Sequence, residues 1–191
     1  MSELPVVKVL GFAGSLRQAS YNKMALRAAG EMLPEGMTLE VFDIAPIPLY
    51  NEDVRELGFP PPVQLFRERI AAADALLIVT PEYNYSMPGV LKNAIDWASR
   101  PPNQPFDGKP VAIMGASPSM LGTGRAQYHL RQSCVYLNML PLNRPEVMIS
   151  QAHTRFDQAG RLNDEATRKF VGDLMVALRD WTRLLARGRE G

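Results

Sequence analysis

The sequence has very few soft metal ligands: one cysteine and two histidines among 191 residues. A single cysteine excludes an internal disulfide, and one cysteine with two histidines leaves too few ligands for a structural zinc site or an iron–sulfur cluster. So low a cysteine count is typical of a chain in a reducing compartment. We therefore expect no bound metal and no disulfide scaffold.

The chain also lacks an excess of either charge. It carries 21 Lys and Arg against 20 Asp and Glu, for a net charge of +1. Because a nucleic-acid-binding domain is usually strongly basic, we expect no nucleic-acid partner. No apolar run approaches the roughly 20 residues that span a membrane, and no basic segment precedes an apolar stretch at the N-terminus. We expect no membrane partner and a cytoplasmic location.

What the sequence has instead is an alternation of short apolar runs with longer stretches whose apolar residues repeat at helical spacing. This alternation is typical of βαβ units around a largely parallel sheet. Continuous apolar runs such as ALLIVT suit strands that are covered on both faces. Strands are predicted at Val6–Phe12, Thr38–Asp43, Ala75–Thr80, Val111–Gly115 and within Leu140–Ile149, and helices at Asn22–Leu33, Val63–Ala73, up to Ser99, Arg125–Tyr136 and Asp164–Arg187.

This order predicts an α/β fold with a single domain over residues 1–191, since no repeat, low-complexity tract or linker interrupts it. Right-handed crossovers favour a flavodoxin-like, five-stranded parallel sheet of order 2-1-3-4-5 with helices on both faces. In that order the first, third and fourth strands are neighbours. The loops at their carboxyl ends, Gly14–Asn22, Pro81–Gly89 and Ala116–Gly124, should therefore converge at one crevice.

The first of these loops, GSLRQASYN, is rich in groups that bind an anion. It leads into a helix N-terminus, where unpaired N–H groups and the helix dipole favour a negative charge. Ser15, Ser20 and Asn22 add short polar side chains, and Arg17 adds a full charge. This inventory suits one terminal phosphate, although the loop is neither a P-loop nor GxGxxG. Ser20 or Asn22 could equally serve as the helix cap.

The second loop, PEYNYSMPG, holds two tyrosines and an asparagine between prolines and a glycine. Such rings and backbone amides can flank a flat heterocycle and hydrogen-bond its edge, but the tyrosines could also pack on the next helix. Glu82 could orient the loop or affect protons beside a redox heterocycle, or it could be a solvated charge or a subunit contact. Ser117, directly after the fourth strand, could contact a ligand or cap a helix.

Three segments in this order, GSLRQASYN, PEYNYSMPGVLKNAIDW and GASPSMLGTGRAQ, resemble the NADPH-dependent FMN reductase family, and in particular its chromate and quinone reductase branch. The resemblance covers about Val7 to Ile149. It implies FMN as cofactor, NADPH or NADH as co-substrate, and a homodimer or homotetramer with the flavin near a subunit boundary. The cofactor-binding residues that it implies are Ser15, Leu16, Arg17, Ser20, Tyr21, Asn22, Pro81, Glu82, Tyr83, Asn84, Tyr85 and Ser117.

One loop departs from the family pattern. Pro118 to Leu121 make the third loop bulkier than the glycine-rich version common in relatives.

Outside the three loops, no residue is assigned a catalytic role. Cys134 lies in an apolar helix and is interpreted as a small core residue. His129 and His153 stand in no catalytic motif, and Trp97 is interpreted as a core or subunit-contact residue. The final helix carries one apolar stripe that should face the core, made of Phe170, Leu174, Ala177, Leu178, Trp181 and Leu185.

Two polar segments are candidates for subunit contacts. The resemblance to a tetrameric family assigns Arg125, Tyr128 and Glu146 to a hydrogen-bonded interface between dimers, whereas the alternative is a solvated helix face. The segment Pro48–Asp53 is a candidate to reach the flavin of a neighbouring subunit.

The expected function is that of an FMN-dependent NAD(P)H oxidoreductase, in which flavin N5 accepts a hydride and a second substrate is then reduced in the same pocket. The expected acceptors are small molecules: quinones and, by resemblance, chromate, azo compounds or free flavin. The cofactor performs the electron transfer, so no catalytic side chain is assigned. One alternative is a non-catalytic electron carrier of the flavodoxin type, although such carriers dock through charge fields that this chain lacks. Another is a small nucleotide-binding protein without flavin.

Overall fold

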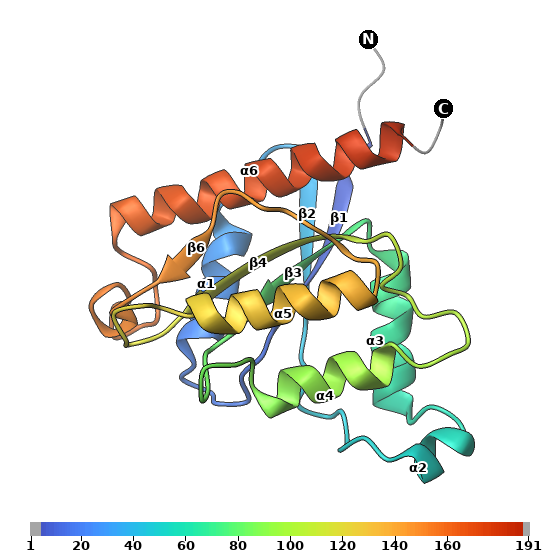
Figure 1. Cartoon of the computed structure of the whole chain (residues 1–191). Helices are drawn as coiled ribbons and strands as arrows, with labels where there is room; N and C mark the ends of the chain where they lie inside the picture. Colours follow the sequence, from blue (N-terminus) through green and yellow to red (C-terminus); the bar gives the residue numbers. More distant parts are fainter. Residues whose placement is uncertain (1–4, 189–191) are drawn as a thin grey trace.

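A parallel sheet forms the centre of the molecule. The computed structural model describes residues 5–188, and its strands are β1 (Val7–Ala13), β2 (Met37–Phe42), β3 (Ala75–Val79), β4 (Pro110–Ala116), β5 (Leu140–Pro141) and β6 (Val147–Ile149). The order β2-β1-β3-β4-β5 confirms the predicted topology (Figure 1). These strands pair in parallel throughout the sheet, including β1 with β3 and β3 with β4. The carboxyl ends of these three strands therefore share one edge.

The predicted fifth strand is divided into two short pieces. β5 pairs with Pro110–Val111 at the start of β4, and β6 pairs with Met114–Ala116 at its end. Pro141 and Pro145 fall in and after the first piece. Because proline has no N–H to donate to a ladder, the two prolines weaken pairing in this edge strand, which is consistent with its division into two pieces. The sequence prediction of one strand within Leu140–Ile149 was therefore too simple.

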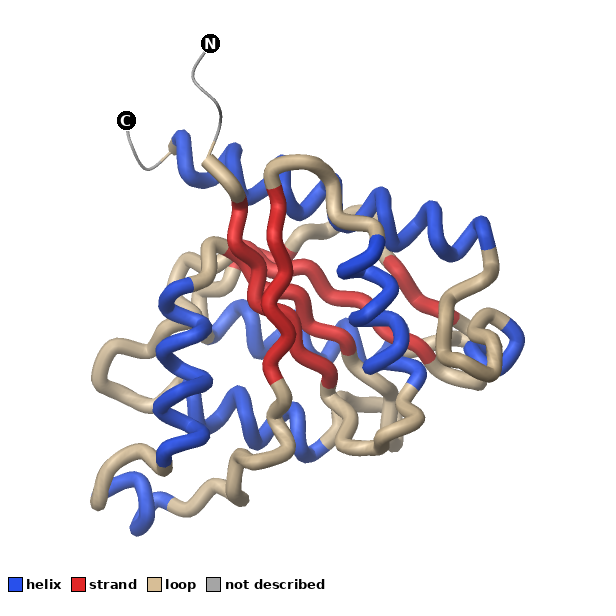
Figure 2. Tube along the Cα trace, turned by 180° about the vertical axis from the view of Figure 1, so that it is seen from behind, coloured by secondary structure: helices blue, strands red, loops and turns tan. Residues whose placement is uncertain are grey.

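Helices cover both faces of the sheet (Figure 2). α1 (Tyr21–Glu31) and α6 (Glu165–Arg187) pack on one face, and α3 (Pro61–Ala72), α4 (Gly89–Ala98) and α5 (Gly124–Tyr136) pack on the other. A short α2 (Glu52–Glu56) and a 3-10 turn (Ala152–Thr154), neither of which was predicted, complete the element order. None of the helices within residues 5–188 is long and apolar enough to cross a membrane.

The strands supply alternate residues to the two cores. Val9 of β1 and Leu77 of β3 belong to the cluster under α1 and α6, whereas Leu10 and Leu76 belong to the cluster under α3, α4 and α5. Both faces of a parallel strand are buried, which explains why these segments read as continuous apolar runs.

The buried face of α6 differs from the predicted stripe. Phe170 is 56% exposed, and Ala177, Trp181 and Leu185 are only partly buried. The buried residues are Val171, Leu174, Met175, Leu178 and Thr182. Leu174 and Leu178 were assigned correctly. The buried face of α6 is centred closer to Val171 than predicted, because α1 and β4 pack against that side of the helix. Periodicity alone did not distinguish these neighbouring faces.

Arg67 on α3 holds the long connection between α4 and β4. Its side chain is 8% exposed, and its guanidinium lies 4.1 Å from the centre of the Phe59 ring. Burial lowers the pKa of this arginine. It donates to the carbonyls of Ala98 at 2.5 Å, Arg100 at 2.7 Å, Pro102 at 2.5 Å and Asn103 at 3.2 Å. The Arg67 guanidinium thus donates hydrogen bonds to the backbone carbonyls of a connection that lies outside the sheet.

Replacing Arg67 tests this role. We expect Arg67→Leu to lower the free energy of unfolding by about 2–4 kcal/mol, because buried carbonyls lose a charged donor. Urea denaturation measures the change. The matched control is Arg69→Leu on the same helix, whose ion pair with Glu40 is exposed and should contribute less than about 1 kcal/mol. Equal losses in the two variants would contradict the assigned role.

Candidate cofactor-binding site

The three predicted loops meet at the carboxyl edge of the sheet. They enclose a cavity of about 120 Å³ lined by Ser15, Arg17, Ser20, Tyr21, Asn22, Pro81, Glu82, Tyr83, Ala116, Ser117 and Pro118. The predicted convergence is therefore confirmed. Leu16, Asn84 and Tyr85 do not line this cavity and are exposed on the same loops. Ala116 and Pro118 line it although sequence reasoning did not single them out as ligand contacts.

The first loop leaves its backbone donors free. Within residues 5–188, no hydrogen bond is donated by the N–H groups of residues 15–19. The Arg17 side chain forms no ion pair with the described part of the chain. These donors stand at the N-terminus of α1, where the helix dipole adds a partial positive charge. The set fits a phosphate dianion such as that of FMN.

Ser20 and Asn22 both have structural partners. Ser20 caps α1: its hydroxyl accepts from the N–H of Asn22 at 3.2 Å and of Lys23 at 3.4 Å. The buried Asn22 amide donates to the carbonyl of Ala116 at 2.9 Å and accepts from the Ala116 N–H at 2.8 Å. The Asn22 side chain thus ties the first loop to the third. Capping accounts for Ser20, and cross-loop pairing accounts for the Asn22 amide.

The second loop forms a tight hairpin. Tyr83 and Ser86 exchange two backbone hydrogen bonds of 3.0 Å. Between them, Asn84 and Tyr85 have φ of 50° and 66°, the positive values of a type I′ turn. In the described residues, neither of these two N–H groups has an acceptor. The turn therefore presents two free backbone donors beside exposed aromatic rings.

Glu82 is a structural carboxylate, and its interpretation as a solvated loop charge was wrong. Its side chain is 6% exposed and forms an ion pair with Arg125. The same carboxylate accepts from the N–H groups of Arg125 at 3.0 Å and Ala126 at 3.2 Å. It therefore caps the N-terminus of α5 from a distant loop. Hydrogen bonding to the carboxylate raises the pKa of Arg125.

The third loop packs against the segment after β6. Ser117 N–H donates to Ile149 at 2.9 Å, and Ser117 O accepts from Ala152 at 3.0 Å. Its hydroxyl accepts from the Ser119 N–H at 3.1 Å and lies 3.1 Å from the Ser119 hydroxyl, so Ser117 makes the local contact of a capping serine, although no helix begins directly after it. Met120 and Leu121, the bulky residues of this loop, are 75% and 61% exposed and do not line the cavity.

A glycine is required where β4 enters this loop. A Cβ on Gly115 would lie 2.1 Å from both the Thr80 carbonyl oxygen and the Thr123 hydroxyl. Such contacts are far inside van der Waals distance, so only glycine lets the ends of β3 and β4 approach this closely.

The other sequence candidates lie away from the cavity. Burial raises the pKa of Cys134 to about 11, which is consistent with an inert core thiol. Trp97 is buried, and its indole N–H donates to the Pro48 carbonyl at 2.9 Å. His129 lies 3.0 Å from the Ser86 hydroxyl through its Nδ1, a contact that no sequence signal indicated. His153 is exposed. No cluster of potential metal ligands occurs among residues 5–188.

The candidate interface residues have partners within the chain. Arg125 pairs with Glu82 rather than with Glu146, whereas the Tyr128 hydroxyl donates to Glu146 at 3.2 Å. The segment Pro48–Asp53 is hydrogen-bonded to α4. The Asn93 side chain accepts from the Tyr50 N–H at 2.8 Å and donates to the Pro48 carbonyl at 2.8 Å.

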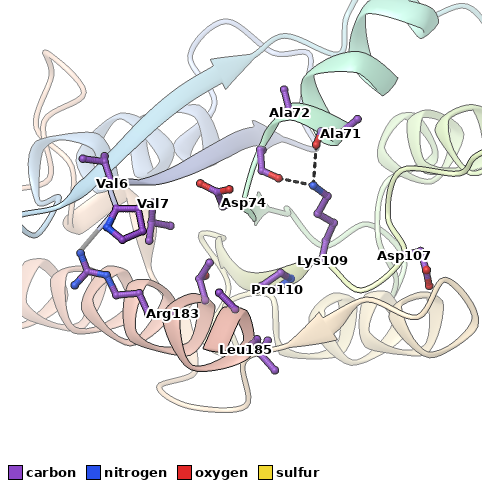
Figure 3. A pocket seen from close by; sticks show the side chains of 14 residues that line it. Val6, Val7, Ala71, Ala72, Asp74, Asp107, Lys109, Pro110, Arg183 and Leu185 are labelled. Atoms are coloured by element: carbon purple, nitrogen blue, oxygen red, sulfur yellow. Dashed lines mark hydrogen bonds between the residues drawn. The ribbon is translucent and has the colours of Figure 1, made fainter. Parts of the chain in front are cut away.

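A second hollow of about 350 Å³ lies at the opposite edge of the sheet (Figure 3). Val7, Asp74 and Lys109, which border it, stand at the amino ends of β1, β3 and β4. Lys109 donates to the carbonyls of Ala71 and Ala73. Ligands of open parallel sheets bind at the carboxyl ends of the strands, so the three-loop cavity is the better candidate for the cofactor.

Comparison with known proteins agrees with this geometry. The profile of the NADPH-dependent FMN reductase family matches residues 7–154. An NAD(P)H-dependent FMN reductase of Pseudomonas aeruginosa is 62% identical over 179 residues, covering 94% of this chain and 97% of the relative. A quinone reductase of Escherichia coli K12 is 46% identical over 164 residues, covering 84% and 87%.

A solved structure shows the same fold. The flavoenzyme NAD(P)H:(acceptor) oxidoreductase of Paracoccus denitrificans is 34% identical, with a TM-score of 0.85 over 93% of this chain and 98% of that one. The chain therefore belongs to the NADPH-dependent FMN reductase family, as its three loop segments predicted, and is an NAD(P)H-dependent oxidoreductase that uses FMN.

Proposed function

We propose that this enzyme transfers electrons from NADPH or NADH to quinones at the three-loop site. The observation that carries the proposal is the set of free backbone donors on two adjacent loops, beside Arg17 and two exposed tyrosines. When bound, FMN supplies the electron-transfer chemistry. The relatives include a 2-hydroxy-1,4-benzoquinone reductase of a Burkholderia species, 44% identical over 178 residues.

The first loop would hold the phosphate. The N–H groups of residues 15–19 supply neutral donors, the α1 dipole adds a partial positive charge, and Arg17 supplies the full charge. Ser15 is 4% exposed and lines the same cavity, so its hydroxyl is a further candidate donor to the phosphate, and hydrogen bonds to an anion are stronger than those between neutral groups.

The second loop would hold the ring system. Asn84 and Tyr85 offer free N–H groups that can bond the carbonyl edge of a flavin and stabilise the negative charge of its reduced form. Glu82 already accepts from three donors on Arg125 and Ala126. Its carboxylate is therefore assigned to holding the loop rather than to moving a proton.

Electron acceptors would be small molecules. The exposed Tyr83 and Tyr85 flank an open surface that a planar quinone can reach and leave. Chromate, azo compounds and free flavin are further proposed acceptors. We also propose that the enzyme works in the cytoplasm, where NADPH and NADH are available.

The direct test is oxidation of NADPH and NADH by FMN-loaded protein, followed at 340 nm with a panel of quinones, chromate, an azo dye and free FMN. We expect quinone-dependent oxidation of the reduced nucleotide. A yellow protein that accepts no electrons from either nucleotide would favour the electron-carrier alternative. A colourless protein that takes up no FMN would contradict the cofactor assignment.

Arg17 provides a test of the phosphate site. We expect Arg17→Ala to raise the dissociation constant for FMN about 10-fold, since one charge-assisted contact to the phosphate is lost. Fluorescence titration of the apoprotein with FMN measures it, and riboflavin, which lacks the phosphate, should bind both forms equally. Arg27→Ala on the exposed face of α1 is the matched control and should change the affinity less than twofold.

Asn22→Ala should act differently from Arg17→Ala. Because it removes both partners of the buried Ala116 backbone, it should lower the free energy of unfolding of the apoprotein by about 1–3 kcal/mol as well as weaken FMN binding. An Arg17→Ala variant that retains FMN at wild-type affinity would contradict the phosphate assignment.

We propose further that the enzyme is a homodimer or homotetramer, with Tyr128 and Glu146 at a contact between copies. The outer face of α5 supports this: Tyr128, Val135 and Tyr136 are 53%, 81% and 87% exposed. The segment Pro48–Asp53 offers Leu49, which is 84% exposed, as a second contact.

Sedimentation velocity tests the assembly. We expect wild-type protein to sediment as a dimer or tetramer, and the double variant Tyr128→Ala, Glu146→Ala to shift toward smaller species. The control removes the exposed ion pair of Lys169 and Asp173 on α6 and should leave the distribution unchanged. A fully assembled Tyr128→Ala, Glu146→Ala variant would refute this interface, and monomeric wild-type protein would refute the assembly itself.

A further inference from the structure

We propose that Arg125 is a positioning residue for the flavin site: through Glu82 and Tyr85 it holds the Asn84–Tyr85 turn in the conformation that presents two free N–H groups. The inference rests on the proposed function, since it assigns those N–H groups to FMN. Arg125 itself does not line the cavity. It lies at the start of α5, behind the second loop.

The first link joins Glu82 to α5. The Glu82 side chain is 6% exposed, and its carboxylate receives the Arg125 guanidinium together with the N–H groups of Arg125 and Ala126. α5 has no side-chain cap of its own at Thr123. Glu82 therefore supplies the cap, and the helix in turn fixes the residue that directly precedes the hairpin.

The second link joins Arg125 to the strained part of the turn. The Arg125 guanidinium lies 3.7 Å from the centre of the Tyr85 ring. Tyr85 has φ of 66°, which is rare for an aromatic residue and persists only where surrounding contacts impose it. The stacked guanidinium is such a contact, because it holds the ring and with it the backbone conformation.

A third contact comes from the same face of α5. His129, one turn after Arg125, lies 3.0 Å from the Ser86 hydroxyl. Ser86 closes the hairpin opposite Tyr83. The helix thus contacts the loop before, within and after the turn, and Arg125 makes two of these three contacts.

A lysine cannot replace this arginine fully. The planar guanidinium stacks on a ring while its N–H groups bond a carboxylate, whereas an ammonium group is a compact point charge. Loss of the cation also leaves the Glu82 carboxylate without its counter-charge beside the site. A negative charge there opposes the gain of electrons by bound flavin.

The experiment compares wild type, Arg125→Met, Arg125→Lys and Arg125→Met with Glu82→Gln. Four quantities are measured: the FMN dissociation constant, the visible circular dichroism of bound FMN, its midpoint potential, and thermal unfolding of the apoprotein. We expect Arg125→Met to raise the FMN dissociation constant roughly 10-fold, change the dichroism and lower the midpoint potential.

The other variants separate charge from stacking. Arg125→Lys keeps the charge and should hold the midpoint potential near wild type, with an altered dichroism spectrum. Adding Glu82→Gln to Arg125→Met should restore the potential without restoring the affinity. Arg131→Met, on α5 but bonded to Leu142, is the matched control. Tyr128 contacts Glu146 and not the second loop. The variant Tyr128→Ala therefore shows how a change in assembly alone affects the four measured quantities.

The outcomes are distinguishable. Wild-type protein that binds no FMN overturns both the proposed function and this inference. Wild-type protein that binds FMN, with Arg125→Met and Arg125→Lys matching it in affinity, dichroism and potential, overturns the positioning role alone. If Arg125→Met does not fold, Arg125→Lys decides: an unchanged dichroism spectrum then refutes the role of the stacked guanidinium.

Discussion

Parallel pairing of β1, β3 and β4 is the constraint on which the rest of the molecule depends. The register places Ala13 beside Val79 and Val79 beside Met114, so three chain segments end their strands at one edge. Each parallel strand needs a crossover, and helices on both faces of the sheet provide it. The carboxyl edge is thereby left to loops, and the cavity forms where they meet. Gly115 permits the close approach of β3 and β4 at this edge.

Loops at a sheet edge are not rigid by topology alone, and cross-loop polar contacts supply the missing restraint. Asn22 pairs with both backbone groups of Ala116 and joins the first loop to the third. Glu82 joins the second loop to α5. These contacts satisfy buried polar groups, so breaking any of them carries a desolvation cost. Among the described residues, they also leave the N–H groups of residues 15–19 and of the Asn84–Tyr85 turn free. Preorganised free donors of this kind are what a cofactor with a phosphate and a carbonyl edge requires.

The difference between local sequence pattern and long-range contacts explains which predictions from the sequence were correct. Strand and helix order, both layers and the convergence of the loops follow from local pattern, because apolar periodicity and glycine- or proline-rich turns act within a few residues. The α6 face was misassigned at Phe170, and the fifth strand was predicted as one piece. The α6 face was misassigned because two adjacent helix faces had similar apolar periodicity. The fifth strand was predicted as one piece because the effect of its prolines on strand pairing was given too little weight.

The sequence by itself determined the fold class and the three loops that line the cavity, because these depend on short-range patterns. Only the tertiary structure decided what individual side chains in those loops do. Glu82 could be read as a solvated charge until α5 was placed beside it, and the pairing of the Asn22 amide with the Ala116 backbone had no counterpart in the local sequence. Their partners lie 43 and 94 residues away along the chain. Contacts over such separations are set by packing of the whole sheet, so no local pattern encodes them.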